Sequence, residues 1–252
     1  ETAWNADIIL PASAHAEKIG TYTNTNRQVQ IGRAVVEPPK EVRQDWWIIQ
    51  EIAKRMGLGW DYKSPKDIFD EMKLVMPSLD NISWERLEKD NHVTYPVKSE
   101  LIPGEDIIFT NGFPTSNNLA KIIPVNLINP NDELNSDFPL ILSTGRLLEH
   151  WHTGTMTRRA VVLNELEPDP MIFMSQVDSN FYNLDLNKSV IIETRRGKIS
   201  IKIRHDDDLL PGMIFLPFCF KEAAANILTN SDLDPIGKIP ELKFSAARVY
   251  QD

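Results

Sequence analysis

The feature that most constrains the fold is the stretch over residues 189–205, SVIIETRRGKISIKIRH. Two β-rich runs flank a turn at Arg196 and Gly197, which is typical of a β-hairpin. Two further β-rich runs, FPLILST and GMIFLPF, lie before and after it. Because several short strands leave exposed edges unless their sheet closes, the residues from Phe138 onward predict a closed or nearly closed barrel.

The first part of the chain indicates one strand, one loop and one helix. DIILPA reads as a short buried strand, and EKIGTYTNTNRQVQ reads as a polar loop. A helix follows, with Asp45 as its expected N-cap and Gly57 where a helix end favours a left-handed residue. Apolar residues at helical spacing predict a face packed on the core: Ile48, Ile49, Ile52, Ala53 and Met56.

Further short helices are predicted at three places. SPKDIFDEMKLVM begins with the cap Ser64, a proline at the first helical position and an aspartate at the third. Another helix is expected to begin near Ser83, and SQVDSNFYNL reads as a short capped helix within the barrel region. The residues from 101 to 137 are rich in proline, asparagine and glycine, which indicates irregular structure leading to a domain boundary.

Charge and cysteine content exclude several classes of protein. The net charge of −9 disfavours a nucleic-acid partner. The single cysteine, Cys219, excludes an internal disulfide framework and a thiolate cluster within the chain, and it fits a reducing, cytoplasmic compartment. We expect no membrane span, because no apolar run approaches the roughly 20 residues that one requires. We also expect no signal peptide, because the first residues lack a basic flank.

The stretch over residues 144–159, TGRLLEHWHTGTMTRR, follows a predicted strand and admits three interpretations. A metal site is one, since His150 and His152 would share a face if they lay on a strand, with His205 or Asp207 as a third ligand. The helical H-E-x-x-H pattern of zinc hydrolases is missing from the sequence. A purely structural role for both histidines is the second interpretation.

An anion site is the third interpretation of the same stretch. A strand that opens into a Thr-Gly-Arg turn presents backbone N–H groups, hydroxyls and a guanidinium together, and arginine suits bidentate phosphate contacts. Neither the P-loop nor the G-x-G-x-x-G pattern occurs. A nucleophilic hydrolase is a weaker alternative, because the G-x-S-x-G elbow is missing and Cys219 reads as a small apolar filler. The basic run TRRGK reads as a solvated turn.

Three stretches carry a resemblance to a known family. They are TGRLLEHWHTGTMTRR, ADIILPASAHAEKIGTYTNTNRQVQ near the start, and PFCFKEAAANILTNSDLDPIGKIPELKFSAARV near the end. Together they resemble the C-terminal part of the alpha subunit of molybdenum- or tungsten-dependent formate dehydrogenases, which are molybdopterin oxidoreductases. ISWERLEKD and TNGFP match the middle of that region more loosely.

The resemblance implies both a fold and an activity. It implies an α/β remainder of the molybdopterin oxidoreductase domain over residues 1–135, followed over residues 136–252 by a double-psi β-barrel that binds the molybdopterin dinucleotide. The intact enzyme would oxidise formate to carbon dioxide with bis(molybdopterin guanine dinucleotide), holding Mo or W, and pass electrons through an iron-sulfur relay to electron-transfer subunits. The metal ligand and the iron-sulfur segment would lie upstream, so the chain alone is expected to be inactive.

The resemblance also implies the site residues. It assigns no catalytic residue and no metal ligand to this chain. Residues matching cofactor-binding positions are Gly145, Arg146, Leu147, His150, Trp151, His152, Thr153, Thr155, Asn226 and Lys243. Residues matching a stretch near the cofactor channel are Glu17, Thr23, Asn24 and Arg27.

Two departures from the family pattern affect local contacts. Cys219 stands where a histidine is frequent, and DLNKSV lacks the glycine of the usual turn before the barrel hairpin. A nitrate reductase or another molybdopterin oxidoreductase would share the cap domain and stays an alternative, as does a cofactor-binding module without turnover. The residues that discriminate between these enzymes would lie upstream.

Overall fold

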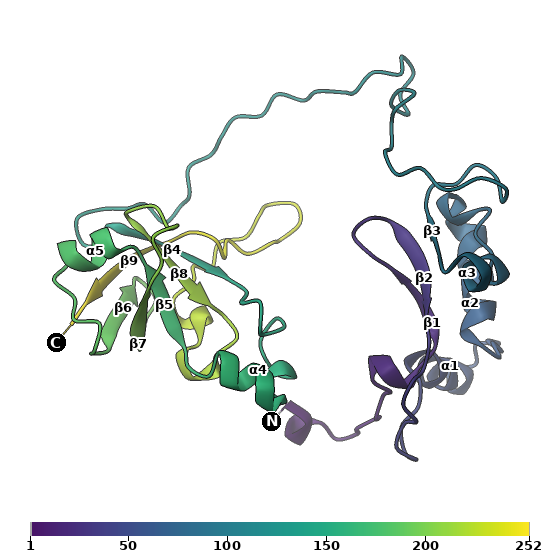
Figure 1. Ribbon diagram of the computed structural model, residues 1–252, viewed down its shortest axis with the longest axis horizontal. Coiled ribbons are helices and arrows are strands. Elements are labelled where there is room, and N and C mark those ends of the chain that lie inside the picture. The colour runs from purple at the N-terminus through teal and green to yellow at the C-terminus, as the bar shows by residue number, and fades with distance from the viewer. Residues whose placement is uncertain (1, 252) are drawn as a thin grey trace. The chain divides into compact units, whose positions relative to one another are not determined.

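The computed structural model describes residues 2–251, which form two compact units, one up to Ile123 and one from Pro124 onward (Figure 1). Each unit has a hydrophobic core of its own. Among the described residues, none of the helices combines the length and the apolar character needed to cross a membrane.

Six strands of the second unit close into a barrel in the order β4-β8-β5-β7-β6-β9 (Figure 1). The pairs β4–β8 and β5–β7 are parallel, and the other four pairs are antiparallel. The predicted barrel is therefore confirmed. The strands are β4 (Leu140–Gly145), β5 (Met171–Met174), β6 (Val190–Thr194), β7 (Lys198–His205), β8 (Met213–Pro217) and β9 (Ser245–Tyr250).

The hairpin that constrains the fold is formed as predicted. Strands β6 and β7 pair antiparallel, with Val190 opposite Ile201 and Ile192 opposite Ile199. Along β7 the burial alternates residue by residue, so Ile199, Ile201 and Ile203 point inward. A period of two in burial is the signature of a strand with one face on the core.

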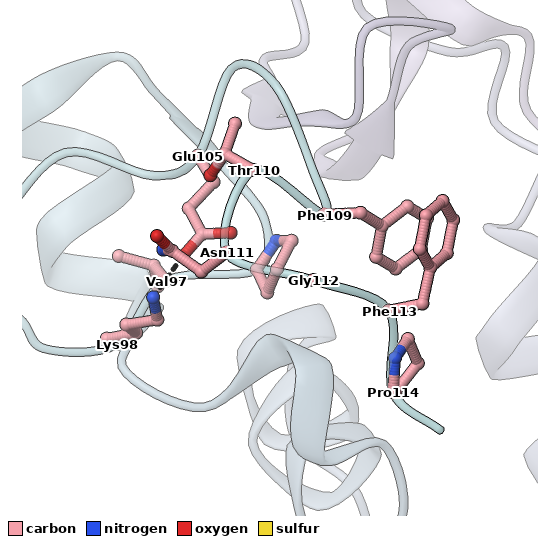
Figure 2. Close-up of a pocket in the computed structure, with 10 residues that line it drawn as sticks. Val97, Lys98, Glu105, Phe109, Thr110, Asn111, Gly112, Phe113 and Pro114 are labelled. Atoms are coloured by element: carbon pink, nitrogen blue, oxygen red, sulfur yellow. Dashed lines mark ion pairs between the residues drawn. The ribbon is translucent and has the colours of Figure 1, made fainter. Parts of the chain in front are cut away.

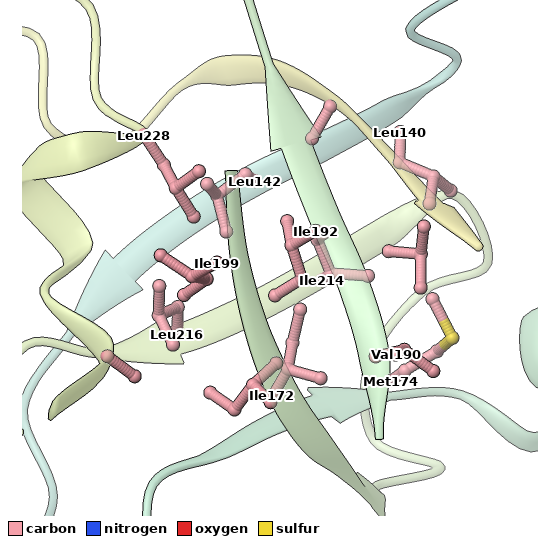
Figure 3. Close-up of a cluster of buried hydrophobic side chains, with 14 of the residues drawn as sticks. Leu140, Leu142, Ile172, Met174, Val190, Ile192, Ile199, Ile214, Leu216 and Leu228 are labelled. Carbon is pink, nitrogen blue, oxygen red and sulfur yellow. The ribbon is translucent and has the colours of Figure 1, made fainter. Parts of the chain in front are cut away.

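The barrel interior is filled with branched aliphatic side chains from all six strands (Figure 3). Ile172, Met174, Val190, Ile192, Ile214 and Leu216 each have 0% of their surface exposed. Aliphatic side chains at this density stabilise the barrel mainly by removing apolar area from water. The interior of the barrel is therefore core, and any ligand site on this unit must lie outside it.

Short helices connect the strands of the barrel. Helix α5 begins after Ser175, whose hydroxyl accepts the Asp178 N–H at 3.1 Å, so the predicted capped helix is confirmed. The helical segments of this unit are η4 (Thr157–Arg159), α4 (Val161–Leu166), α5 (Gln176–Phe181), η5 (Lys221–Ala223) and η6 (Ala225–Ile227).

The first unit contains a small antiparallel sheet where a polar loop was expected. Its strands are β1 (Gly20–Thr23), β2 (Gln28–Gly32) and β3 (His92–Thr94), in the order β1-β2-β3. The prediction was wrong because the strand residues are mostly threonine, tyrosine and glutamine. Threonine and tyrosine favour strands but do not register as apolar. Only Val29 and Ile31 turn inward from β2.

Helix α1 (Asp45–Arg55) forms near its predicted position but not with its predicted role. Gln44 occupies the N-cap, and Asp45 is the first helical residue, with its carboxylate on the Lys18 ammonium. The face expected to pack on the core is largely uncovered, with Ile49 56% exposed and Met56 75% exposed. Gly57 has a φ of 85°, as its place at the helix end predicts.

The other helices of this unit follow the sequence pattern. Helix α2 (Pro65–Val75) is capped by Ser64, with Asp67 completing the capping box, and α3 (Trp84–Asp90) is capped by Ser83. Short 3-10 turns are η1 (Thr2–Asn5), η2 (His15–Glu17) and η3 (Pro77–Leu79). The core beneath them consists of Val29, Ile31, Phe69, Leu79, Ile82, Trp84, Leu87, Val93 and Val97.

The run DIIL is not a buried strand. Residues 8–11 belong to no strand, and Ile8, Ile9 and Leu10 are 78%, 60% and 55% exposed. Ala12 makes a single parallel bridge to Arg43. Consecutive apolar residues are typical of a strand covered on both faces, and the described residues cover neither face here.

We predict that Ile172→Ala destabilises the barrel by about 2–5 kcal/mol, because it leaves a cavity among fully buried side chains. The matched control is Ile236→Ala, since Ile236 is 91% exposed. Urea unfolding of both variants measures the difference. Equal losses of stability would contradict the assignment of Ile172 to the core.

Candidate cofactor-binding site

The predicted site stretch begins where two parallel strands end together. Gly145, the last residue of β4, lies opposite Pro217, the last residue of β8. Carboxyl ends of parallel strands meet at one edge, so the loops after β4 and β8 start side by side. We call this place the β4–β8 edge, and it is defined by Gly145 and Pro217. It brings TGRLLEHWHTGTMTRR next to PFCFKEAAANIL.

Gly145 is needed at this edge because of close packing. A Cβ on it would lie 2.4 Å from the Phe215 ring. Its carbonyl accepts the Phe218 N–H at 3.1 Å, which ties the two loops together at their first residues. A side chain at this position would therefore push β8 away from β4.

The residues just past the edge present a cation and an aromatic face. The Arg146 guanidinium lies 5.5 Å from the centre of the Trp151 ring, and both side chains are exposed. Leu147, the residue after Arg146, is half-buried. An exposed guanidinium held over an aromatic ring keeps its N–H donors available to an anion.

His150 supports the loop from inside. It is 1% exposed, and its Nε2 lies 2.7 Å from the Glu167 carbonyl oxygen. Because a carbonyl only accepts, Nε2 donates in this contact, and Nδ1 is left for the Thr157 hydroxyl at 3.3 Å. Its ring also packs edge-on against Phe220. The structure thus engages both ring nitrogens of His150 within the chain.

The next residues of the loop face outward. His152, Thr153 and Thr155 are exposed, and His152 has a φ of 51°. Gly154 between the threonines has a φ of 72°, and a Cβ there would lie 2.7 Å from the Cys219 carbonyl oxygen. Only glycine permits this approach of the two loops, which leaves both threonine hydroxyls on the surface.

The metal interpretation of EHWH does not hold for this structure. It required His150 and His152 to share a face of a strand, but residues 149–152 form a loop. One imidazole is buried and the other is exposed. No group of three or more His, Cys, Asp or Glu that could hold a metal ion occurs within residues 2–251.

Lys243 reaches the same edge from the far end of the chain. Its ammonium donates to the Thr144 carbonyl oxygen, and the Thr144 hydroxyl donates to the Leu242 carbonyl at 2.7 Å. Lys243 is therefore held at the end of β4 by this contact, and Arg146 directly follows the last residue of that strand. Asn226 is exposed on η6, on the continuation of the loop after β8.

Arg158 and Thr157 also serve this site, although sequence analysis did not single out their roles. The Arg158 guanidinium pairs with Glu222 at 2.6 Å and lies 4.8 Å from the centre of the Phe220 ring, which joins the two loops. Thr157 accepts the Trp151 N–H at 3.0 Å. For Arg158 the position in the loop was the only available signal, because its partners are the distant Phe220 and Glu222.

Cys219 is a buried filler, as expected. It is 1% exposed, and burial raises the pKa of the Cys219 thiol to about 11. A thiol with so high a pKa is almost wholly protonated near neutrality and is a poor nucleophile.

The four residues near the start of the chain hold turns in the first unit. The Arg27 guanidinium donates to the carbonyls of Tyr95, Glu105 and Asp106. Asn24 exchanges hydrogen bonds with Gln28 across the β1–β2 turn, and Glu17 accepts the Ala14 N–H. Thr23 is exposed at the end of β1. The contacts of Glu17, Asn24 and Arg27 are those of structural residues.

A separate hollow of about 290 Å³ lies in the first unit (Figure 2). Its wall includes the Lys98–Glu105 ion pair, at 2.6 Å, and the stacked rings of Phe109 and Phe113, whose centres are 4.9 Å apart. None of the predicted cofactor-binding residues lines it. It is therefore distinct from the β4–β8 edge.

Comparison with family models matches the barrel unit and the start of the chain. Residues 140–246 match the molydopterin dinucleotide binding domain, and residues 1–55 match the molybdopterin oxidoreductase domain. The chain thus contains a molybdopterin oxidoreductase region and a molydopterin dinucleotide-binding region. The barrel is a domain of a kind that binds a molybdopterin dinucleotide.

Curated relatives of this chain include formate dehydrogenases. It is 41% identical to the F420-dependent formate dehydrogenase subunit alpha of Methanocaldococcus jannaschii, over 99% of this chain and 37% of that protein. It is 37% identical to formate dehydrogenase 2 subunit alpha of Methanococcus maripaludis, again over 99% of this chain and 37% of that protein. The chain therefore spans little more than a third of the length of these relatives.

A solved structure shares the fold of this chain. Acetylene hydratase from Pelobacter acetylenicus matches with a TM-score of 0.69 and 20% identity, over 96% of this chain and 38% of that one. At this identity the likeness concerns the fold alone.

The donors at the β4–β8 edge fit an anionic dinucleotide. Arg146 and Lys243 supply two cations, and Thr153 and Thr155 supply exposed hydroxyls. Guanidinium, ammonium and hydroxyl groups are among those that proteins use to bind phosphates.

We predict that His150→Ala lowers the free energy of unfolding by about 1–3 kcal/mol, because it removes a buried imidazole and leaves the half-buried Glu167 carbonyl without its donor. His152→Ala, at an exposed histidine in the same loop, is expected to cost markedly less. Urea unfolding of the two variants tests this. Equal losses would remove the supporting role of His150.

We predict that the Cys219 thiol of the folded protein stays unmodified by a maleimide at pH 8, because the group is buried and its pKa is about 11. The same reagent should modify one thiol per chain in urea. Intact mass measures the extent. Rapid labelling of the folded protein at pH 8 would contradict the burial described for Cys219.

Proposed function

We propose that this chain is the cofactor-binding portion of a formate dehydrogenase alpha subunit. The observation that carries the proposal is the 41% identity to a formate dehydrogenase alpha subunit, extending over 99% of the chain. The intact enzyme would oxidise formate to carbon dioxide and pass two electrons to an iron-sulfur relay. The cationic β4–β8 edge supports this proposal because it supplies donors for the cofactor's phosphates.

The proposed cofactor is bis(molybdopterin guanine dinucleotide) with Mo or W. When bound, it supplies the two-electron chemistry, and the protein supplies binding, orientation and exclusion of water. In this proposal Arg146 and Lys243 neutralise phosphate charge, Thr153 and Thr155 donate hydroxyl hydrogens, and Asn226 reads the edge of a heterocycle. The roles of the remaining residues concern the shape of the loop.

Gly145 and Leu147 set the path of the chain where it leaves β4. Trp151 offers an aromatic face beside Arg146, and His152 is the exposed imidazole of the pair. His150 holds the loop in place through Glu167 rather than contacting the ligand itself. None of these side chains is proposed to be catalytic or to ligate the metal.

The proposed partner is the portion of the same subunit that would carry the iron-sulfur and metal-ligating residues. The uncovered apolar surface of the first unit supports this. Ile8 and Leu10 face Trp47, Ile48 and Ile52 of α1 across a groove of about 520 Å³. Apolar surface of this kind is typical of a face that another domain covers. Electron-transfer subunits and formate complete the proposed set of partners.

The domain assignment and the compartment belong to the same proposal. Residues 1–135 would be the remainder of the α/β molybdopterin oxidoreductase domain, and residues 136–252 the dinucleotide-binding barrel. A cytoplasmic location fits the single cysteine. A nitrate reductase is the alternative substrate class, but the relatives whose names give a substrate point to formate.

We predict that the double variant Arg146→Ala/Lys243→Ala loses most of the pterin from the complex purified through a tag on this chain, because it removes both cations of the edge. Lys202→Ala, on the outer face of β7, is the matched control and should retain pterin. Pterin is measured as its fluorescent oxidation product, with metal analysis and formate-dependent dye reduction alongside. Full pterin in the double variant would contradict the site, and no pterin in the unmodified complex would contradict the function.

A further inference from the structure

The two arginines of the β6–β7 turn bind one buried carboxylate. Arg195 and Arg196 both form ion pairs with Asp132, whose side chain is 1% exposed. The turn is solvent-exposed, as TRRGK predicted, but its guanidiniums also have this partner within the chain. Asp132 lies before β4 and outside residues 140–246, which the dinucleotide-binding family model matches.

The same carboxylate has a third donor. The Ala246 N–H, in the second residue of β9, donates to Asp132 at 2.8 Å. Arg195 also donates to the Glu133 carbonyl at 2.8 Å, and this fixes the segment that carries Asp132. Asp132 therefore joins the residues before the barrel, the β6–β7 turn and the start of β9.

Two of these three segments, the start of β9 and the β6–β7 turn, are linked to residues proposed to contact the cofactor. Ala246 follows Lys243 by three residues, so anchoring β9 at Ala246 limits how far the Lys243 segment can move. At the same time Lys243 is held to Thr144 at the end of β4. The Lys243 side chain and the Ala246 backbone, three residues apart, are thus both held by hydrogen bonds.

The β6–β7 turn is linked by hydrogen bonds to the segment that carries Asn226. The Arg196 N–H donates to the Thr194 hydroxyl oxygen at 3.2 Å, and that hydroxyl donates to the Leu228 carbonyl at 2.9 Å. Leu228 lies two residues after Asn226. The orientation of the β6–β7 turn therefore sets the position of the loop on which Asn226 lies.

A buried carboxylate with two guanidiniums and a backbone N–H is a rigid junction. Each contact is charge-assisted, and such contacts are shorter and stronger than those between neutral groups. Removing the charge leaves two guanidiniums facing a partner that can no longer neutralise them. The segments that Asp132 joins should then move more freely relative to one another.

We propose that Asp132 is a positioning residue for the cofactor site, holding residues 226–246 so that Asn226 and Lys243 stay at the β4–β8 edge. This rests on the proposed function, because these two residues are cofactor contacts only within it. Asp132 itself is assigned no contact with the ligand.

Hydrogen–deuterium exchange of the full chain tests the junction directly. Asp132→Asn is expected to speed exchange in peptides covering 226–246 by about tenfold or more, while peptides over β5 and α5 keep their rates. Arg196→Ala, which leaves Arg195 on the carboxylate, should give a smaller change in the same peptides and serves if Asp132→Asn does not fold. Ile172→Val, a mild core change, is the control for a general loss of stability.

The cofactor readout separates positioning from mere structure. In the purified complex, Asp132→Asn should retain less pterin than the Ile172→Val control, and Asp132→Glu should recover part of the loss. Exchange that rises evenly across the barrel, or pterin retained in full by Asp132→Asn, would overturn the positioning role. Segment-selective exchange together with an unmodified complex that lacks pterin would overturn the cofactor site instead, and with it the role of Asp132 there.

Discussion

The closure of the barrel through β4 is the constraint on which the rest of the second unit depends. Strand β4 pairs parallel with β8 and antiparallel with β9, so it brings together parts of the chain more than seventy residues apart. The parallel pairing makes two loops begin at the same edge, and the antiparallel pairing brings the start of β9 back toward that edge. Without this strand, Lys243 would not reach the Thr144 carbonyl, two residues before Arg146.

Packing around two glycines fixes the course of both loops where they leave the strands. The Phe215 ring fills the space beside Gly145, and the Cys219 carbonyl fills the space beside Gly154. Polar groups of the loop that do not face outward are engaged by contacts within the chain, including both ring nitrogens of His150. The polar groups left exposed on the loop include the Arg146 guanidinium and the hydroxyls of Thr153 and Thr155, whose chemistry suits phosphate.

The sequence predicted features with local causes and missed those with distant ones. The β6–β7 hairpin and the Ser64 cap depend on neighbouring residues, and both were correct. The uncovered face of α1 was missed because apolar spacing shows which side of a helix seeks a partner, not whether one is present. Asp132 was missed because its partners lie 63, 64 and 114 residues away.

The aliphatic core of the barrel and its polar edge lie mostly on separate residues. Inward positions of the strands supply most of the core, joined by Ala223, Ala225 and Leu228 from the segment after β8, while the loops beyond Gly145 and Pro217 carry exposed polar groups. Such a division lets the loops diverge while the scaffold is preserved, which fits a shared fold at only 20% identity with a protein named as a hydratase.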